Sequence, residues 1–436
     1  MNELINNEKK SDTNLRGYLV FLIGQWVSIL GSNIVGFGII WFLTITTESA
    51  FVLGLATFLN FAPFLIATPI AGVFIDRWSR KRVIAFVDFM QAVFTVILIG
   101  FFVVDVFSPL ELVAIILALN TIRATFGAFH TSAVDTLLPI MVPKEQYSRI
   151  NGVNYLVNGA INIVGPLLGA VVLGLVSLQN LLWLDVITFL IAIVPTLIIF
   201  IPEVKKVILD EGEKLSIRSE LREGLKFIRE TPGLIALLFV FAGSNFFIPP
   251  FFIQLPLFVT SIHFGNESDL AFLMASQQAG MLIGSTIMST WKGFENHARG
   301  VALGIFLGYL GFMVMLLAPV GSFLVISIGL FITGFVLPVA NVSSEAIWAA
   351  TVPRELLGRV YAVRRTLAQM TAPVAMLLSG IIAEIIGLYS LLMLFVILGT
   401  LILGYSWFFT ELSNVEKIIQ ETKEQESIEK VQSTPQ

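Results

Sequence analysis

The chain has 436 residues, of which 56% are hydrophobic and only 13% are charged. Ordinary soluble domains carry about 25% charged residues, so this composition predicts a membrane protein. The formal net charge of -4 gives no general reason to bind nucleic acid, and the absence of cysteine excludes disulfides, thiol catalysis and thiolate metal sites.

Twelve apolar runs follow one another along the chain, each long enough to cross a bilayer, which takes about 20 apolar residues in a helix. We therefore predict an all-α membrane protein with twelve transmembrane helices. The first run is too long for a signal peptide and lacks a cleavage site, so it is expected to remain as a span. The expected ranges are 17–46, 50–75, 83–105, 109–138, 150–176, 179–201, 232–262, 268–291, 300–318, 322–350, 359–386 and 388–410.

The loop after the second run, "GVFIDRWSRKRV", gathers charged side chains between two apolar stretches. Lys and Arg accumulate on the cytoplasmic side of membrane proteins. If both termini are cytoplasmic, all but one of the 26 Lys and Arg residues lie on that side. We expect this topology, in a cell (inner) membrane, and it makes the loop cytoplasmic.

The remaining basic residue, Arg123, lies near the middle of the fourth run. An arginine at that depth costs at least about 2.5–3.5 kcal/mol, so it is expected to face the protein interior and to have partners. Backbone carbonyls of the first helix and the side chains of Gln25 and Asn33 are the expected acceptors.

Four asparagines, Asn151, Asn154, Asn158 and Asn162, share one face of the fifth run. Amides facing lipid are unfavourable, so the stripe faces a wet cavity or another helix. We assign Asn158 and Asn162 to a substrate cavity, with hydrogen bonding between helices as the alternative.

The seventh run contains three prolines, Pro249, Pro250 and Pro256, which interrupt the helical hydrogen bonds and predict a flexible gate. Polar residues of this and later runs complete a plausible cavity lining. With those already named, the expected set is Gln25, Asn33, Asn158, Asn162, Asn245, Gln254, Gln277, Gln278 and Gln369.

A polar segment, residues 202–231, separates six runs from six and carries seven basic and seven acidic residues. It is interpreted as a cytoplasmic linker with an amphipathic surface helix over 215–228. The expected organisation is an N-terminal half, 1–201, this linker, a C-terminal half, 232–410, and a charged cytoplasmic tail, 411–436.

An internal repeat relates the two halves. "DTLLPIMVPKEQYSR", 135–149, and "EAIWAATVPRELLGR", 345–359, share an acid, a Val-Pro-base-Glu turn and a closing Arg at an offset of 210 residues. Duplication explains this better than coincidence. Two six-helix halves in the same orientation predict a transporter that rocks around a central cavity.

These residues resemble the major facilitator superfamily over essentially the full chain. "GVFIDRWSRK", 72–81, is similar to the family's Gly-x-x-x-Asp-Arg/Lys-x-Gly-Arg-Arg/Lys loop, with Ser79 in place of a glycine. The corresponding loop of the second half lacks the Asp-Arg core. The first three helices resemble the drug–proton antiporter branch that includes macrolide efflux proteins, which implies the major facilitator fold.

The charged loop then suggests a cytoplasmic gate. Charge pairs between the halves form a latch that opens and closes, for instance Asp76 with the start of the eleventh helix, Arg364 or Arg365, and Arg80 with Asp135. The alternative is that the basic residues of the loop only set the orientation of the protein in the membrane. The expected gate residues are Asp76, Arg77, Arg80, Lys81, Asp135, Arg149, Glu345, Arg359, Arg364 and Arg365.

Two further motifs bear on coupling. "RATFG", 123–127, resembles the family's Arg-x-x-x-Gly motif, which implies proton relay by Arg123; a structural anchor for the first helix is the alternative. "GPLLGA", 165–170, resembles the antiporter motif, with a bend at Gly165, Pro166 and Gly169 that implies export. Asp185 is chosen as the proton-coupling acid, with a structural cap as the alternative.

The function predicted is proton-coupled efflux of amphipathic small molecules by alternating access. Siderophore or lysolipid transport, or a non-transporting receptor on the same scaffold, are the alternatives. No catalytic constellation or phosphate-binding loop is present in the sequence, so no enzyme activity, cofactor or metal is expected. The expected partners are the substrate, protons and the lipid bilayer, with no nucleic acid, and the protein is expected to act as a monomer.

Overall fold

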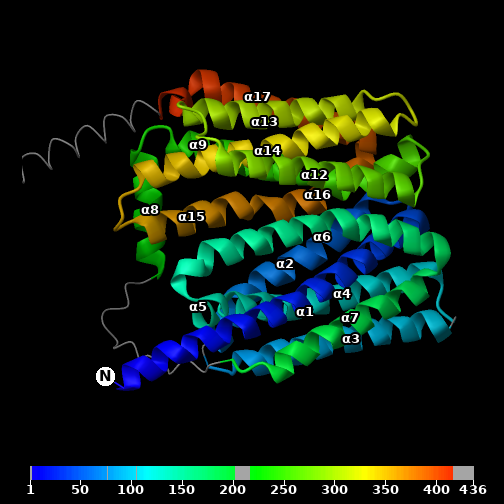
Figure 1. Cartoon of the computed structure of the whole chain (residues 1–436). Coiled ribbons are helices and arrows are strands. Elements are labelled where there is room, and N and C mark those ends of the chain that lie inside the picture. Colours follow the sequence, from blue (N-terminus) through cyan, green and yellow to red (C-terminus); the bar gives the residue numbers. More distant parts are fainter. Residues whose placement is uncertain (1, 76, 105, 202–216, 416–436) are drawn as a thin grey trace, which may run out of the picture. The chain divides into compact units, whose positions relative to one another are not determined.

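The computed structural model describes residues 2–75, 77–104, 106–201 and 217–415, without the side chains of 2–14, 217–220 and 369. These residues form helices and turns with no strand (Figure 1). Twelve of the helical segments are long and apolar enough to cross a membrane. The predicted all-α class and the number of spans are confirmed, and the chain is a multi-pass membrane protein.

The first six spans are close to their predicted ranges. α4 begins at a capping box, in which the Ser108 hydroxyl accepts from the Glu111 amide and the Glu111 carboxylate accepts from the Ser108 amide. The helices are α1 (Asn2–Thr47), α2 (Ala50–Ile75), α3 (Arg80–Val104), α4 (Pro109–Asp135), the short α5 (Leu138–Met141), a 3-10 turn (Lys144–Gln146), α6 (Tyr147–Leu175) and α7 (Leu178–Ile198).

The predicted surface helix of the linker is α8 (Ile217–Glu230), which runs crosswise to α9 and α15 in Figure 1. The helices that follow are α9 (Leu234–Phe247), α10 (Pro249–Ile253), α11 (Leu255–Leu257), a π-helical turn (Phe258–Ile262), α12 (Glu267–Thr290), α13 (His297–Leu316), α14 (Phe323–Thr351), α15 (Leu357–Gln369), α16 (Thr371–Ile386), α17 (Leu388–Phe409) and a 3-10 turn (Glu411–Asn414).

Two of the twelve spans are broken, and the interruption of the seventh by its prolines was predicted. The seventh is divided into α9, α10, α11 and the π-helical turn, because each proline lacks an amide hydrogen and crowds the preceding turn. The eleventh is divided at Met370 into α15 and α16, a break that the sequence analysis did not expect. Pro373 explains it, since it has no N–H to donate to the carbonyl of Gln369.

The chain divides into two compact units. Of the described residues, the N-terminal unit comprises those up to 201 together with Val259–Ala275, and the C-terminal unit comprises 217–258 and 276–415. In the N-terminal unit α1 packs against α6 and α7, α3 packs against α4 and α7, and α2 packs against α4. In the C-terminal unit α13 packs against α14 and α17.

Glycines permit the close approach of α1 to α7. Gly24, Gly31 and Gly38 recur every seventh residue on α1, and each faces α7. A Cβ atom on Gly24 would lie 2.9 Å from Pro195 Cγ, closer than van der Waals contact allows. The spacing places all three on one side of the helix, so α7 lies along most of α1.

The two copies of the sequence repeat have the same local conformation. Val142 and Val352 each end a helix with an extended backbone (ψ 136° and 122°), and each precedes a proline. The extended backbone is what a following proline imposes. A short turn follows in each case before α6 and α15 begin, so corresponding residues build corresponding corners.

Candidate functional site

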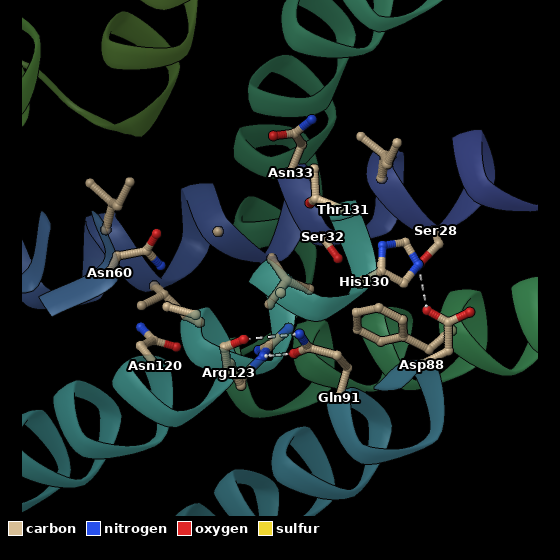
Figure 2. A pocket seen from close by; sticks show the side chains of 18 of the residues that line it. Ser28, Ser32, Asn33, Asn60, Asp88, Gln91, Asn120, Arg123, His130 and Thr131 are labelled. Atoms are coloured by element: carbon tan, nitrogen blue, oxygen red, sulfur yellow. Dashed lines mark hydrogen bonds and ion pairs between the residues drawn. The ribbon is translucent and has the colours of Figure 1, made fainter. Parts of the chain in front are cut away.

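A polar cavity of about 580 Å³ lies within the N-terminal unit. This volume is in the range of sites for drug-sized ligands. Figure 2 shows polar side chains from α1, α2, α3 and α4 facing it, with apolar residues of α1 and Phe189 of α7 completing the wall. Its polar lining consists of Gln25, Ser28, Ser32, Asn33, Thr57, Asn60, Asp88, Gln91, Asn120, Arg123, His130 and Thr131.

Arg123 forms an ion pair with Asp185, and the distance between Nη2 and Oδ2 is 2.8 Å. Its Nε donates to Gln91 Oε1 at 2.8 Å, and the Gln91 amide donates back to the Arg123 carbonyl at 3.1 Å (Figure 2). The expected acceptors, Gln25 and Asn33, line the same cavity but bind other groups. Gln91 on α3 and Asp185 on α7 are therefore the partners, and the expectation of acceptors on the first helix was wrong.

Asp185 is fully buried, and its carboxylate has three partners. Ser32 Oγ donates to Oδ1 at 2.9 Å, and Thr95 Oγ1 donates to Oδ2 at 2.8 Å, beside the arginine. The arginine is 15% exposed, toward the cavity, and its guanidinium carbon lies 5.8 Å from the centre of the Phe189 ring. Complete hydrogen bonding of this kind is what makes a charge pair tolerable inside a membrane protein.

A second titratable pair lies in the same cavity, which the sequence analysis missed. His130 Nε2 on α4 and Asp88 Oδ1 on α3 are 3.1 Å apart. Figure 2 shows the two side chains facing one another. Gln25 Nε2 lies 3.4 Å from the other oxygen of Asp88. Helical spacing is the signal that could have found this pair. His130 is seven residues after Arg123 and Asp88 is three before Gln91, so the His130–Asp88 contact and the Arg123–Gln91 hydrogen bond join the same faces of α4 and α3.

The asparagine stripe of α6 bonds partly to α1. The Trp26 indole donates to Asn154 at 2.9 Å, and Asn33 donates to Asn162 at 3.3 Å. The Asn158 amide donates within α6, to Asn154. Neither Asn158 nor Asn162 lines the 580 Å³ cavity, whereas Gln25 and Asn33 do. Hydrogen bonding between helices is therefore present at two of these positions.

The glycines of the GPLLGA stretch lie against α1. A Cβ on Gly165 would be 2.7 Å from the Cβ of Asn33, and one on Gly169 would be 3.0 Å from the Ile34 carbonyl oxygen. Pro166 is buried within α6, which is helical on both sides of it. The stretch thus brings α6 close to the α1 segment that carries Ser32 and Asn33.

Two of the predicted gate residues of the N-terminal unit, Arg80 and Lys81, bind within that unit. Asp76 lies outside the described residues. Arg80 Nε donates to Thr136 Oγ1 at 3.0 Å, next to the predicted partner Asp135. Lys81 Nζ donates to the carbonyls of Leu197 and Ile199 at 2.6 and 2.9 Å, where a cation stabilises the C-terminal end of α7. Arg77 and Arg149 are exposed.

The predicted gate residues of the C-terminal unit form two ion pairs. Arg364 binds Glu345 at 2.7 Å, and its guanidinium carbon lies 5.1 Å from the Trp348 ring centre and 5.4 Å from that of Tyr361. This group lines a second cavity, of about 620 Å³, with Asn245 and Arg365. Of the other predicted cavity residues, Gln254 is buried, Gln277 and Gln278 are half-buried on α12, and the Gln369 side chain is not described.

The second ion pair joins the linker helix to the eleventh span. Arg359 Nη1 lies 2.6 Å from Glu223 Oε2, and a Cβ on Gly224 would be 2.6 Å from the Arg359 carbonyl oxygen. The close approach at Gly224 and the adjacent charge pair together hold α8 against α15.

We expect Arg359→Glu to loosen α8, because it places two acids together where a pair stood. An exposed pair is worth up to about 1 kcal/mol, so amide hydrogens of α8 should exchange about fivefold faster. Hydrogen exchange measured by mass spectrometry checks this. The double variant Arg359→Glu, Glu223→Arg restores the pair with reversed charges and should return exchange to the original rate; unchanged exchange in the single variant contradicts the role given to the pair.

Comparisons with known proteins agree with this architecture. Residues 21–326 match the sequence profile described as Major Facilitator Superfamily. The chain is 28% identical over 399 residues to macrolide efflux protein A of Streptococcus pyogenes, covering 91% of this chain and 95% of the relative. It is 26% identical over 346 residues to the multidrug efflux pump Tap of Mycolicibacterium fortuitum, covering 75% and 80%.

A solved structure shares the fold. The chain resembles a bacterial homologue of the human lysosomal transporter Spinster, in an inward-facing and unoccupied conformation, with a TM-score of 0.65 and 14% identity. The match covers 93% of this chain and 98% of that one.

Proposed function

The chain belongs to the major facilitator superfamily, and we propose that it is a secondary active transporter that exports amphipathic small molecules in exchange for protons. The printed names of its relatives, macrolide efflux protein A and multidrug efflux pump Tap, support efflux and this class of substrate. The internal repeat and the two units of the fold support transport by alternating access. The distribution of Lys and Arg supports a cell-membrane location with both termini cytoplasmic.

The proposal of proton coupling rests on the ion pair between Arg123 and Asp185 beside the cavity. A carboxylate next to a guanidinium stays ionised, whereas a carboxylate left in apolar surroundings without a cation takes up a proton. A movement that draws Arg123 away from Asp185 therefore loads a proton, and the return of Arg123 releases it. Arg123 faces the cavity, so an entering substrate has direct access to the mobile partner of the pair.

The test uses Asp185→Asn in proteoliposomes with an imposed pH gradient. Asparagine has the same shape but only one acceptor oxygen, which serves either Ser32 or the side of Thr95 and Arg123, and it holds no acidic proton. Labelled macrolide should still equilibrate by counterflow, but it should no longer accumulate when the pH gradient is applied. The matched control is Glu145→Gln, which neutralises an exposed acid on a loop of the same unit and should accumulate substrate normally.

Two outcomes contradict the proposal. If Asp185→Asn concentrates substrate as the unchanged protein does, Asp185 is structural. If the unchanged protein moves no protons with any transported compound, exchange for protons is wrong and a facilitator or a sodium-driven cycle replaces it.

A further inference from the structure

A groove of about 750 Å³ lies where α2 ends and α3 begins, and it shares no residue with the polar cavity of the N-terminal unit. Two of its residues are the exposed arginines Arg77 and Arg82. Residues of α4 form its deeper end. The groove thus combines two cations with an apolar wall, which includes Phe74, Trp78, Phe86, Val87, Phe126 and Phe129.

The two arginines differ from the other basic residues of their loop. Residues 76–82 hold four basic residues and one acid, Asp76, which lies outside the described residues. Arg80 and Lys81 bind protein groups, as described above. No ion pair joins Arg77 or Arg82 to another residue of the described chain. Orientation in the membrane requires only that basic residues lie on one side, and it does not explain why these two line one apolar groove.

The groove changes from charged to apolar along its length. Arg77 and Arg82 lie at the ends of the spans, whereas Phe86 is about 9 Å along α3 and Phe126 is about 13 Å from the end of α4, at 1.5 Å per residue. Trp78 is 56% exposed at the charged end, and tryptophan side chains are typical of the level of the lipid headgroups. A lipid has the same order of parts, a charged head followed by hydrocarbon.

A second groove, of about 650 Å³, lies between the start of α3 and the chain that leaves α7. It shares Ser79 and Arg82 with the first groove. Its wall includes Leu197 and Phe200, and Phe200 is 77% exposed. Two grooves that meet at one serine and one arginine fit a molecule with one polar head and two hydrocarbon chains.

We propose that an anionic phospholipid with two acyl chains binds here, with its phosphate at Ser79 and Arg82 and one chain in each groove. A guanidinium binds phosphate through two parallel hydrogen bonds, and the hydroxyl of Ser79 is a further donor. Arg77 supplies a second cation beside the head. A zwitterionic lipid carries its own cation next to the phosphate, so it gains less from two arginines. This lipid site is independent of the proton coupling proposed above.

The experiment uses the purified full chain in detergent and native mass spectrometry, which resolves each bound lipid. The probes are dioleoyl phosphatidylglycerol, which is anionic, and dioleoyl phosphatidylcholine, which has the same chains and no net charge. A basic residue near the membrane surface strengthens the attraction to anionic lipid about fivefold. The first phosphatidylglycerol should therefore bind at least about tenfold more tightly than the first phosphatidylcholine.

A pair of double variants assigns the preference to the two arginines. Arg77→Gln with Arg82→Gln should reduce the preference for phosphatidylglycerol to about twofold or less, because both cations beside the head are lost. The matched control is Lys292→Gln with Arg299→Gln, which removes two exposed basic residues from the corresponding loop of the C-terminal unit and should leave the preference unchanged. Thermal unfolding establishes that each variant is folded.

Single variants test the two grooves. Phe86→Ala shortens the wall of the first groove and Phe200→Ala that of the second, so each should weaken phosphatidylglycerol binding about fivefold through lost apolar contact. Phe89→Ala is the control, because Phe89 is 51% exposed on α3 and lines neither groove, and it should bind the lipid as the unchanged protein does.

Three results would overturn the inference. The first, which needs no variant, is equal affinity of the unchanged protein for the two lipids. The second is an equal loss of preference in the two double variants, which would show that net charge alone attracts the lipid. The third is binding of glycerol 3-phosphate as tight as that of phosphatidylglycerol, which would show that the site holds a free anion and that the grooves contribute nothing. Proton-coupled export would survive all three, since Asp185→Asn tests it separately.

Discussion

Arg123→Leu is expected to abolish transport and to lower the yield of folded protein sharply. The change leaves the fully buried carboxylate of Asp185 without a cation, with only Ser32 and Thr95 as partners. Removing one member of a buried ion pair destabilises a protein by about 3–5 kcal/mol. Fluorescence-detected gel filtration and thermal unfolding in detergent measure the loss of folded protein.

The reverse change should be milder. Asp185→Asn leaves Arg123 unpaired, but the arginine is 15% exposed toward the cavity and still binds Gln91. The double variant Arg123→Leu, Asp185→Leu removes both charges and should recover most of the folded yield without recovering pH-driven transport. Should the double variant transport as the unchanged protein does, the pair has neither a coupling nor a positioning role. A single Arg123→Leu variant of normal stability contradicts the burial argument.

Gly304→Ala is expected to destabilise the C-terminal unit by about 1–3 kcal/mol, the range for overpacked cores. The added Cβ on α13 would lie 2.8 Å from the backbone nitrogen of Ala340 on α14, so it can be accommodated only if the helices move apart. Thermal unfolding in detergent should show a lower midpoint.

Gly308→Ala provides the matched control one turn further along α13. Its Cβ would meet Val336 Cγ2 at 3.7 Å, an ordinary contact, so stability should change little. Both changes raise helix propensity equally, and only the space available differs. Equal effects of the two substitutions would show that close packing of α13 on α14 does not limit stability.

The number and place of the spans followed from the sequence because the bilayer fixes helix length and excludes unpaired backbone groups. The points at which a span breaks into shorter helices depend on single residues. The break near Pro249, Pro250 and Pro256 was predicted from the sequence. The break at Met370, three residues before Pro373, was not, because the helical pattern of the eleventh span continues without interruption through this region.

The candidate site was less accessible to sequence reasoning. Arg123 and Asp185 were both singled out, but their pairing depends on the rotation and depth of α4 relative to α7, which periodicity within one helix does not give. Position along the helices did not indicate the pair either, since Asp185 lies in the first half of its helix whereas Arg123 lies near the middle of its span. His130 and Asp88 were overlooked because each looks isolated in the linear sequence, and only the folded chain brings them within 3.1 Å.

The position of α7 has a consequence for synthesis. This helix supplies the carboxylate for Arg123, Ser32 and Thr95, and the terminal carbonyls for Lys81. It is also the last of the first six spans to leave the ribosome. Until it enters the bilayer, Arg123 has no counter-ion, Ser32 and Thr95 lack the carboxylate of Asp185, and the glycine face of α1 lacks α7 to pack against. Entry of α7 therefore completes the half in one step, and a nascent chain halted before that step exposes its unpaired polar groups to the quality control of the membrane.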